Sequence, residues 1–282
     1  MRVLCEVCRS GVRDRVLASA QVLGECGECG HLTRDLTRAP AAHRDLAYGG
    51  EPTLDRARLT LTYRTMTRRI RPGSVFEVGY GDGSMLRRFH DDGARTSGAD
   101  PDQLHVDVDP VVARVADLFQ GPVEDAPTDR APVDLVYGVH VLEHVRDPIA
   151  TLEIGRRMLR PGGMAQFFTP AGDSDGLRLY ADAWWMLEDP THIRFFTAAS
   201  LANAAERAGF VDVQVRRPML DSLTTDVASA VRRWRPAPRP EGVLGERRVL
   251  AAGLATAPAV LVARCVRPTM RPTLQLVARN PR

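Results

Sequence analysis

Two pairs of cysteines near the start of the chain have the spacing of a metal site. Cys5 and Cys8 are separated by two residues, and after seventeen intervening residues Cys26 and Cys29 repeat that spacing. Two residues between cysteines let a tight turn direct both thiolates at one ion about 2.3 Å away. The pattern predicts a structural Zn²⁺ site, because four protein ligands leave no coordination position for a reaction. Two disulfides are the alternative, which a reducing compartment disfavours.

A glycine-rich turn follows a short apolar run at residues 74–78. Residues 77–83 read E-V-G-Y-G-D-G, and glycines let a chain bend sharply while its N–H groups approach a ligand. After a strand of a parallel sheet, such a turn is typical of nucleotide sites, in which an acid about 20 residues further on binds the ribose hydroxyls. Asp100 fits that position, and Asp107 and Asp109 are the alternatives if the second strand lies later. The early third glycine disfavours a nicotinamide-dependent reductase.

Imidazole and carboxylate side chains follow another apolar run, at residues 133–137. His140, Glu143 and His144 are three or four positions apart, a spacing that places side chains on one face of a helix. Imidazole titrates near neutral pH, so His140, His144 and the later His192 are candidate general bases that would remove a proton from an acceptor. We expect His192 to be that base. Glu143 either takes part in the chemistry or holds its loop through local hydrogen bonds.

These residues require a framework of alternating strands and helices. Short buried runs predict strands at residues 74–78, 133–137 and 166–169, and alternation predicts one at 210–215. Further candidate strands lie at 95–99 and 273–278. Helical spacing of apolar residues predicts helices at residues 54–70, 85–90, 148–159 and 198–208. Asp147 is the expected N-cap of the third helix, and R-P-G-G at 160–163 is the expected turn after it. The alternation predicts a doubly wound, mostly parallel α/β sheet.

Changes in composition along the chain predict three segments. They are a zinc-binding module at residues 1–45, a core with the sheet at 46–217, and an Arg- and Pro-rich insertion with an apolar helix and the final strand at 218–282. The apolar stretch at 249–266 is interrupted by Gly253, Pro258 and Arg264. We therefore expect a buried or interfacial helix there rather than a membrane span.

Composition and charge exclude several function classes. The 282 residues include 38 basic and 35 acidic ones, and the formal net charge of +3 does not indicate a nucleic-acid-binding protein. All of the basic residues counted are arginine, so neither a Schiff-base lysine nor a P-loop lysine is present. The chain starts M-R-V-L-C-E-V-C, without the apolar core of a signal peptide, and we expect a cytoplasmic protein.

The order of these motifs resembles that of class I S-adenosylmethionine-dependent methyltransferases. E-V-G-Y-G-D-G is similar to the first motif of that family, and the segment with L-E-H-V, at 132–148, is similar to its fourth-strand segment. R-P-G-G resembles the turn before the fifth strand, and T-H-I-R-F-F-T at 191–197 resembles a substrate-side segment. The resemblance covers about residues 45–216. It implies a Rossmann-like sheet that binds S-adenosylmethionine and is closed by an antiparallel last strand.

In the glycine-rich turn, the resemblance assigns residues to the methionine part of the cofactor. Gly79, Gly81 and Gly83 would pass the backbone around it. Tyr80 stands between them, where the family usually has a small residue or cysteine. Glu77 would lie near the amino group of the cofactor, and capping a helix is its alternative role.

Beyond the turn, the resemblance implies further contacts. Asp100 would bind the ribose hydroxyls, and Glu124 with Asp125 would bind the adenine, unless these two acids are only solvated. His140 would lie near the transferable methyl group. The H-x-x-E-H order at 140–144 is similar to the E-x-x-E-H order with which some ubiquinone-pathway O-methyltransferases bind a divalent metal, except that histidine replaces the first glutamate.

The expected activity is transfer of a methyl group to a small molecule, a sugar or secondary metabolite, at oxygen or carbon, with a histidine base. Trp184 and Trp185 are expected to line the acceptor pocket or to pack in the core. The insertion before the last strand would cover the acceptor, mediate a homodimer or touch a membrane surface.

Two other function classes fit the same motifs. One is a ribosomal RNA methyltransferase whose zinc module contacts phosphates through arginines, namely Arg2, Arg9, Arg13, Arg15 and Arg34. The other is a non-enzymatic subunit that keeps the cofactor fold and binds a partner protein.

Overall fold

The chain is described by a computed structural model that covers residues 3–40, 52–101, 106–129, 132–222, 224–234 and 247–282. These residues form two compact units, and each unit is assembled from separate stretches of sequence. The sheet unit comprises Thr62–Thr169, Leu201–Arg216 and Gln275–Arg282. The cysteine unit comprises Met1–Leu61, Pro170–Ser200 and Arg217–Leu274.

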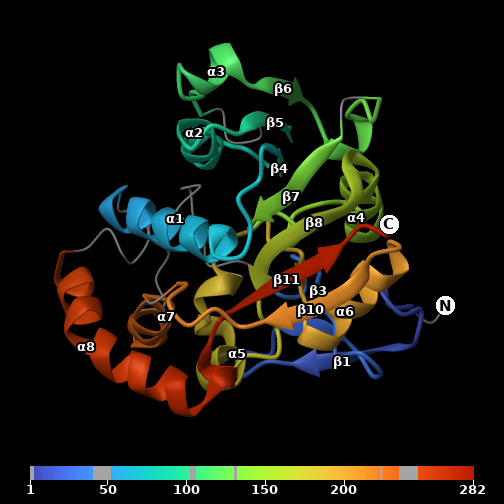
Figure 1. Cartoon of the computed structure of the whole chain (residues 1–282). Helices are drawn as coiled ribbons and strands as arrows, with labels where there is room; N and C mark the ends of the chain where they lie inside the picture. Colours follow the sequence, from blue (N-terminus) through green and yellow to red (C-terminus); the bar gives the residue numbers. More distant parts are fainter. Residues whose placement is uncertain (1–2, 41–51, 102–105, 130–131, 223, 235–246) are drawn as a thin grey trace. The chain divides into compact units, whose positions relative to one another are not determined.

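The sheet unit is built on seven strands in the order β10-β11-β8-β7-β4-β5-β6 (Figure 1). The strands are β4 (Ser74–Val78), β5 (Arg95–Asp100), β6 (Asp117–Gln120), β7 (Val133–Val139), β8 (Leu159–Pro170), β10 (Val211–Arg216) and β11 (Thr273–Arg279). The five strands from β6 to β8 pair in parallel, and β10 and β11 pair antiparallel. The predicted mostly parallel, doubly wound sheet is confirmed.

Helices α2 (Ser84–Asp91), α3 (Val112–Val115) and α4 (Pro148–Met158) lie in the connections between parallel strands. Helix α1 (Pro52–Thr67) precedes β4 in the chain, and α6 (Ala198–Arg207) precedes β10. The α2 helix packs against β4 and β5, and α4 packs against β7. The predicted cap of α4 is confirmed, because the Asp147 carboxylate accepts hydrogen bonds from the N–H groups of Ile149 and Ala150 at 2.9 and 3.1 Å.

Burial on both faces explains why the central strands read as continuous apolar runs. In β4, Val75, Phe76 and Val78 are all at most 2% exposed, although neighbouring side chains point to opposite faces. A polar residue inside such a strand has no solvent to interact with. The buried Glu77 is therefore an exception that calls for a partner.

The R-P-G-G segment lies inside a strand, and the prediction that it forms a separate turn is wrong. Strand β8 starts at Leu159, directly after α4. Leu159 pairs with Val133, whereas the next paired position is Met164 with Leu135, so the intervening residues bulge out of the ladder. Gly162 adopts a φ of 74° there, a conformation that glycine tolerates best.

The cysteine unit contains a small antiparallel sheet in the order β1-β2-β3-β9. Its strands are β1 (Val12–Val16), β2 (Val22–Cys26), β3 (Leu32–Arg34) and β9 (Arg194–Phe195). The N-terminal strands thus pair with a segment more than 150 residues further along the chain. A hydrophobic core beside this sheet includes Trp184 and Trp185, at 0% and 7% exposed. Core packing is therefore the role of these two tryptophans.

The C-terminal part of the cysteine unit is more helical than the sequence indicates. Helix α7 (Thr225–Trp234) lies in the segment expected to be an Arg- and Pro-rich insertion, for which no helix was predicted before residue 249. Helix α8 (Arg247–Val266) coincides with the apolar stretch, and the two helices pack side by side (Figure 1). Within the described residues, no helix has both the length and the apolarity needed to cross a membrane. Short helices α5 (Asp175–Tyr180), η2 (Ala181–Ala183) and η3 (Trp185–Leu187) lie earlier in the cysteine unit, and η5 (Pro268–Met270) follows α8.

Candidate cofactor site and metal centre

The glycine-rich turn leaves β4 at its carboxyl end and leads directly into α2. Gly79, Gly81 and Gly83 have φ angles of 73°, 51° and 75°, all in the left-handed region that other residues rarely adopt. Space is also limited, because a Cβ atom on Gly79 would lie 3.0 Å from Val141, and one on Gly83 would lie 3.0 Å from Val112. The turn therefore requires glycine for both conformation and packing.

Asp100 lies beside this turn, at the carboxyl end of the neighbouring strand β5. Its Oδ2 atom accepts a hydrogen bond from the N–H of Gly81 at 2.8 Å. The two alternative acids are placed differently. Asp109 accepts hydrogen bonds from two N–H groups at the start of α3, and Asp107 is exposed. Because the second strand ends at Asp100, that residue keeps the position expected of a ribose-binding acid.

Glu77 is a buried carboxylate directly below the turn, only 4% exposed. Its Oε2 atom accepts a hydrogen bond from the Tyr137 hydroxyl at 2.9 Å. Burial raises the pKa of Glu77 well above its ordinary value, and the nearby Asp82 and Asp100 raise it further, while the Tyr137 hydrogen bond and the Leu86 N–H oppose the rise. A cationic ligand at this position would relieve the cost of the buried negative charge.

Tyr80 belongs to the glycine-rich turn, and its ring packs against Gly98 of the neighbouring strand β5. A Cβ atom on Gly98 would lie 3.1 Å from Cδ1 of Tyr80 and 2.9 Å from the carbonyl oxygen of Glu77. The missing side chain of Gly98 thus makes room for the ring that occupies an unusual position in the turn. Sequence reasoning did not identify Gly98, although a glycine inside a strand is a sign of a close approach by another part of the chain.

The two acids expected near the adenine lie in a short 3₁₀ helix, η1 (Val123–Asp125). Glu124 accepts a hydrogen bond from the hydroxyl of Thr151 in α4, which fixes its carboxylate. Asp125 is exposed. Both residues follow the carboxyl end of β6, on the side of the sheet where the glycine-rich turn also lies.

His140 and Glu143 form a hydrogen-bonded pair after the carboxyl end of β7. The Nδ1 atom of His140 lies 3.0 Å from Oε1 of Glu143, and the other carboxylate oxygen accepts a hydrogen bond from the Thr169 hydroxyl at 3.0 Å. Glu143 and Thr169 are both 0% exposed. His140 has a φ of 56°, a conformation that is concentrated at functional sites when a residue other than glycine adopts it.

The geometry of this pair determines which ring nitrogen of His140 is available to a proton. A carboxylate accepts only, so Nδ1 carries a hydrogen and Nε2 is the basic atom of the neutral ring. The expectation that His140, Glu143 and His144 share a helix face is wrong, because they lie in a non-helical turn. Thr169 was not predicted from the sequence. Its hydroxyl, near the end of β8 beside β7, is the one feature that could have indicated it.

His192, the residue expected to be the base, belongs to the cysteine unit and is 6% exposed. Its Nδ1 atom lies 2.7 Å from the carbonyl oxygen of Met186, so Nδ1 is the donor and Nε2 is the basic atom. The Nε2 atom is 3.9 Å from Oδ2 of Asp189. His192 thus has a fixed tautomer, as His140 does.

The four N-terminal cysteines converge, and all of their sulfur atoms lie within 4.8 Å of one another. The sulfurs of Cys5 and Cys29 are 3.8 Å apart, and those of Cys8 and Cys26 are 3.3 Å apart. A tetrahedral Zn²⁺ with bonds of about 2.3 Å would separate its sulfurs by about 3.8 Å. All four are free thiols. Their number, chemistry and spacing fit one Zn²⁺ ion.

A polar cluster connects the cysteine cluster to β9. The Nε2 atom of His31 is 2.7 Å from Oε1 of Glu6, and Nε of Arg194 donates to the same oxygen at 2.8 Å. The other ring nitrogen of His31 is 3.3 Å from the hydroxyl oxygen of Ser200. Because its nitrogens interact in this way, His31 is a neighbour of the cysteines rather than a replacement for one of them.

Comparison with known proteins agrees with this geometry. Residues 53–215 match the family described as Methyltransferase domain. A probable S-adenosylmethionine-dependent methyltransferase of Mycolicibacterium smegmatis is 30% identical over 151 residues, which cover 53% of this chain and 56% of that protein. The malonyl-[acyl-carrier protein] O-methyltransferase of Serratia marcescens is 28% identical over 126 residues, which cover 44% and 49%. The chain thus spans about half the length of these curated relatives.

A solved structure extends the likeness to most of the chain. It is a complex of the Haloferax volcanii Trm112 methyltransferase activator with a methyltransferase, and the match has a TM-score of 0.53 and 21% identity. It covers 83% of this chain and 94% of the matched chain, and at this identity it shows the fold alone. Together with the family match over more than half of the sequence, the strand order and the glycine-rich turn, this assigns the chain to the class I S-adenosylmethionine-dependent methyltransferase family.

Proposed function

We propose that the protein transfers the methyl group of S-adenosylmethionine to a small-molecule acceptor. The observation that carries the proposal is the group of carboxylates around the glycine-rich turn. Glu77, Asp82 and Asp100 bring three acids together, and Glu77 is buried. S-adenosylmethionine carries an ammonium and a sulfonium group, and these positive charges would balance the negative charge of the three carboxylates.

The glycine-rich turn and the acids around it would each hold a different part of the cofactor. The backbone of the glycine-rich turn passes close to the methionine part, and Glu77 balances the charge of its amino group. Asp100 accepts hydrogen bonds from the ribose hydroxyls, while Glu124 and Asp125 contact the adenine. The bound cofactor supplies an electrophilic methyl group, so the protein has to orient the acceptor and remove its proton.

A histidine is the proposed general base. His140 follows β7, whose carboxyl end is paired with that of β4, where the cofactor turn begins. Glu143 holds its ring, which leaves Nε2 as the proton acceptor. His192, the base that the sequence favours, becomes the second candidate, because His140 follows the strand that pairs with β4. Met186 fixes the tautomer of His192 in the same sense. A relative named for O-methyl transfer supports an oxygen acceptor, whose proton such a base would remove.

The arginines of the cysteine unit support a small molecule rather than RNA as the acceptor. Arg13 and Arg15 each lie 3.6 Å from a carboxylate oxygen of Glu25. Arg34 is only 7% exposed and donates to backbone carbonyls, so it does not present a charge to a phosphate backbone. Arg2 lies outside the described residues. Arg9 is exposed and could still contact a phosphate. The ion pairs of Arg13 and Arg15 and the burial of Arg34 nevertheless weaken the electrostatic binding on which RNA recognition depends.

The cysteine cluster is proposed to hold a structural Zn²⁺ ion. Cys5, Cys8, Cys26 and Cys29 would complete its coordination, which leaves no position for an acceptor. The ion would fix β1, β2 and β3 in a segment whose own strands are short.

Titration calorimetry with S-adenosylhomocysteine tests the cofactor part of the proposal. We expect the wild type to bind and Asp100→Ala to bind about tenfold more weakly or worse, since hydrogen bonds to a charged group are lost. Asp107→Ala, an exposed acid nearby in sequence, is the matched control and should bind as the wild type does. Absence of binding to the wild type would instead favour a non-enzymatic subunit.

Transfer of labelled methyl groups from S-adenosylmethionine tests the acceptor class. We expect product in the small-molecule fraction when the protein is incubated with a panel of hydroxylated metabolites, and none in ribosomal RNA. Labelling of the RNA fraction alone would overturn the small-molecule assignment and support the RNA methyltransferase.

A further inference from the structure

Helix α8 carries an apolar surface that the described part of the chain leaves exposed. Leu254, Val262 and Val266 are 60%, 65% and 81% exposed, and alanines and a proline fill the positions between them. The hydroxyl of Thr256 is bonded to the carbonyl of Ala252 in its own helix, so even this polar residue makes an internal hydrogen bond. Contiguous exposed apolar surface of this kind marks interaction sites.

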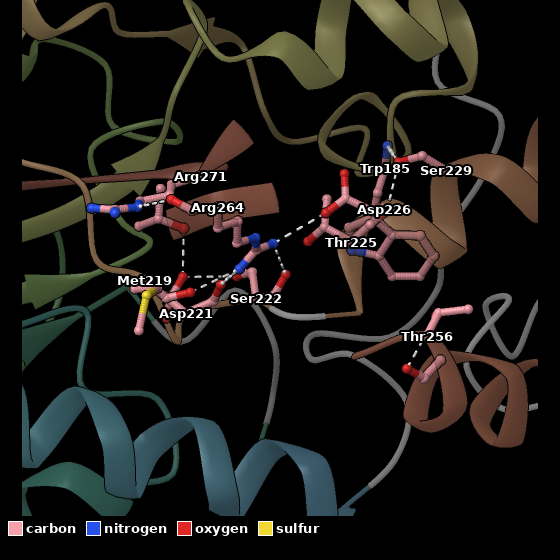
Figure 2. Close-up of polar contacts among 12 residues, drawn as sticks. Trp185, Met219, Asp221, Ser222, Thr225, Asp226, Ser229, Thr256, Arg264 and Arg271 are labelled. Atoms are coloured by element: carbon pink, nitrogen blue, oxygen red, sulfur yellow. Dashed lines mark hydrogen bonds and ion pairs between the residues drawn. The ribbon is translucent and has the colours of Figure 1, made fainter. Parts of the chain in front are cut away.

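The opposite face of α8 packs against other residues of the cysteine unit. Arg264 is 0% exposed, and its guanidinium donates to the carbonyls of Asp221 and Ser222 at 2.7 and 2.9 Å and to the Asp226 carboxylate at 3.3 Å (Figure 2). A Cβ atom on Gly253 would lie in contact with α7. Because these contacts set the rotation of the helix about its axis, the apolar surface faces outward.

The charges of α8 are of one sign. Its charged residues are Arg247, Arg248 and Arg264, and it contains no aspartate or glutamate. Arg247 and Arg248 are exposed at the first turn, whereas Arg264 is occupied by Asp226. The exposed surface therefore combines an apolar strip, about 20 Å long at 1.5 Å per residue, with a positive end.

We propose that α8 docks the protein on an anionic membrane surface. The aliphatic side chains would enter the boundary between headgroups and acyl chains, and Arg247 with Arg248 would pair with anionic headgroups. Arginine suits that position because its planar guanidinium binds phosphate oxygens in pairs. The helix would lie in the plane of the membrane surface and not cross it, in agreement with its insufficient apolarity.

Charge complementarity favours a membrane over a second copy of the chain. Two α8 helices packed in parallel would bring the exposed arginine pairs at their first turns together. Packed antiparallel, they would place each pair near Arg267 at the far end of the partner helix, which Asp175 already pairs, and neither helix would contribute an acid of its own. An anionic surface supplies the opposite charge for Arg247 and Arg248 and also covers the apolar strip.

Vesicle flotation with the full chain tests this proposal. We expect the wild type to float with vesicles of phosphatidylglycerol and phosphatidylcholine but not with vesicles of phosphatidylcholine alone. Leu254→Gln/Val262→Gln should bind the anionic vesicles about tenfold more weakly or worse, since two exposed aliphatic groups no longer enter the lipid. Arg247→Gln/Arg248→Gln should bind more weakly and lose much of the dependence on salt concentration.

Val16→Gln is the matched control, because Val16 is 66% exposed in β1, outside the proposed surface. It should bind vesicles as the wild type does, and circular dichroism should be unchanged for every variant, since all replaced side chains are exposed. The proposal is overturned if the wild type ignores anionic vesicles or if Leu254→Gln/Val262→Gln binds them normally. A wild-type dimer that this double variant converts to monomer in analytical ultracentrifugation would also overturn it, in favour of a second copy.

Discussion

The carboxylate of Glu143 holds the imidazole of His140, with 3.0 Å between Oε1 and Nδ1, and it does so without access to solvent. The hydroxyl of Thr169 donates to the second carboxylate oxygen at the same distance. The three residues come from a turn after β7 and from the end of β8. A buried carboxylate that accepts from both sides fixes the tautomer and the orientation of the ring.

The relation between His140 and Glu143 predicts a loss of turnover with little loss of cofactor affinity. If His140 is the base, His140→Gln should lower turnover about 100-fold or more, because general base catalysis contributes at least that much. Glu143→Gln should lower turnover by a smaller factor, since the ring is present but less well oriented. Both variants should bind S-adenosylhomocysteine with nearly wild-type affinity in calorimetry.

His192→Ala decides between the two candidate bases in the same assay. We expect it to lower turnover less than His140→Gln does. A larger loss for His192→Ala, with normal turnover for His140→Gln, would transfer the role of base to His192. His144→Gln tests the third candidate base in the same assay, and a loss as large as that of His140→Gln would transfer the role to His144.

Replacement of Glu77 should have opposite effects on stability and on cofactor binding. The folded-state pKa of Glu77 is raised above its ordinary value, so the folded protein loses stability as the pH rises above the unfolded pKa of about 4.3, where the unfolded chain releases a proton that the folded chain retains. Glu77→Gln removes this cost, and differential scanning calorimetry without cofactor should give a higher Tm at pH 7. The same variant should bind S-adenosylmethionine more weakly, because the charge opposite the ammonium is lost.

The pH dependence provides the control for Glu77. Below the unfolded pKa both states carry the proton, and the difference in Tm between the wild type and Glu77→Gln should become small. A lower Tm for Glu77→Gln at pH 7 would show that the carboxylate stabilises the protein without a bound cation, as a helix cap that accepts from the Leu86 N–H.

Metal removal should destabilise the protein through the cysteine cluster. Elemental analysis of the purified protein should find about one zinc per chain. Incubation with a chelator, or Cys26→Ser, should lower the Tm measured by circular dichroism. Cys265→Ser is the matched control, because Cys265 is exposed and lies outside the cluster, and it should leave both zinc content and Tm unchanged. A wild type without zinc would contradict the assignment.

Asp134 should stabilise the sheet unit in a pH-dependent way. Burial alone would raise the pKa of Asp134, but the hydrogen bonds from Arg160 and from the N–H groups of Gly73 and Ser74 hold it below its ordinary value. A depressed folded-state pKa means that the stabilisation is complete above the unfolded pKa of about 3.9 and is lost as the pH falls further.

Asp134→Asn should therefore lower the free energy of unfolding by about 2 kcal/mol at pH 7, the usual value for hydrogen bonds to a charged group. Urea unfolding at pH 7 and near pH 3 measures the effect, which should decrease at the lower pH. Asp129→Asn, at an exposed position, should have no effect at either pH. A constant deficit for Asp134→Asn across this range would contradict the role of its charge.

Local chemistry explains which parts of the fold could be predicted from sequence. The strand at 74–78 was predicted with its observed bounds, because burial on both faces gives a continuous apolar run between turn signals. The cap at Asp147 was predicted from one acid and the proline after it. Helix α7 was missed, since its arginines and the prolines that follow it obscured a helix whose buried face packs within its own unit.

Sequence alone determined the family, the glycine-rich turn and the cysteine spacing, because each depends on short motifs along the chain or on a steric need for glycine. Tertiary structure favoured Asp100 over Asp107 and Asp109, since Asp100 ends β5 and accepts a hydrogen bond from Gly81. The ring of Tyr80 fits only because Gly98 stands on the neighbouring strand, and Thr169 meets Glu143 only because β7 and β8 pair in parallel. Such contacts are set by strand register and packing between distant segments, which the order of residues does not reveal locally.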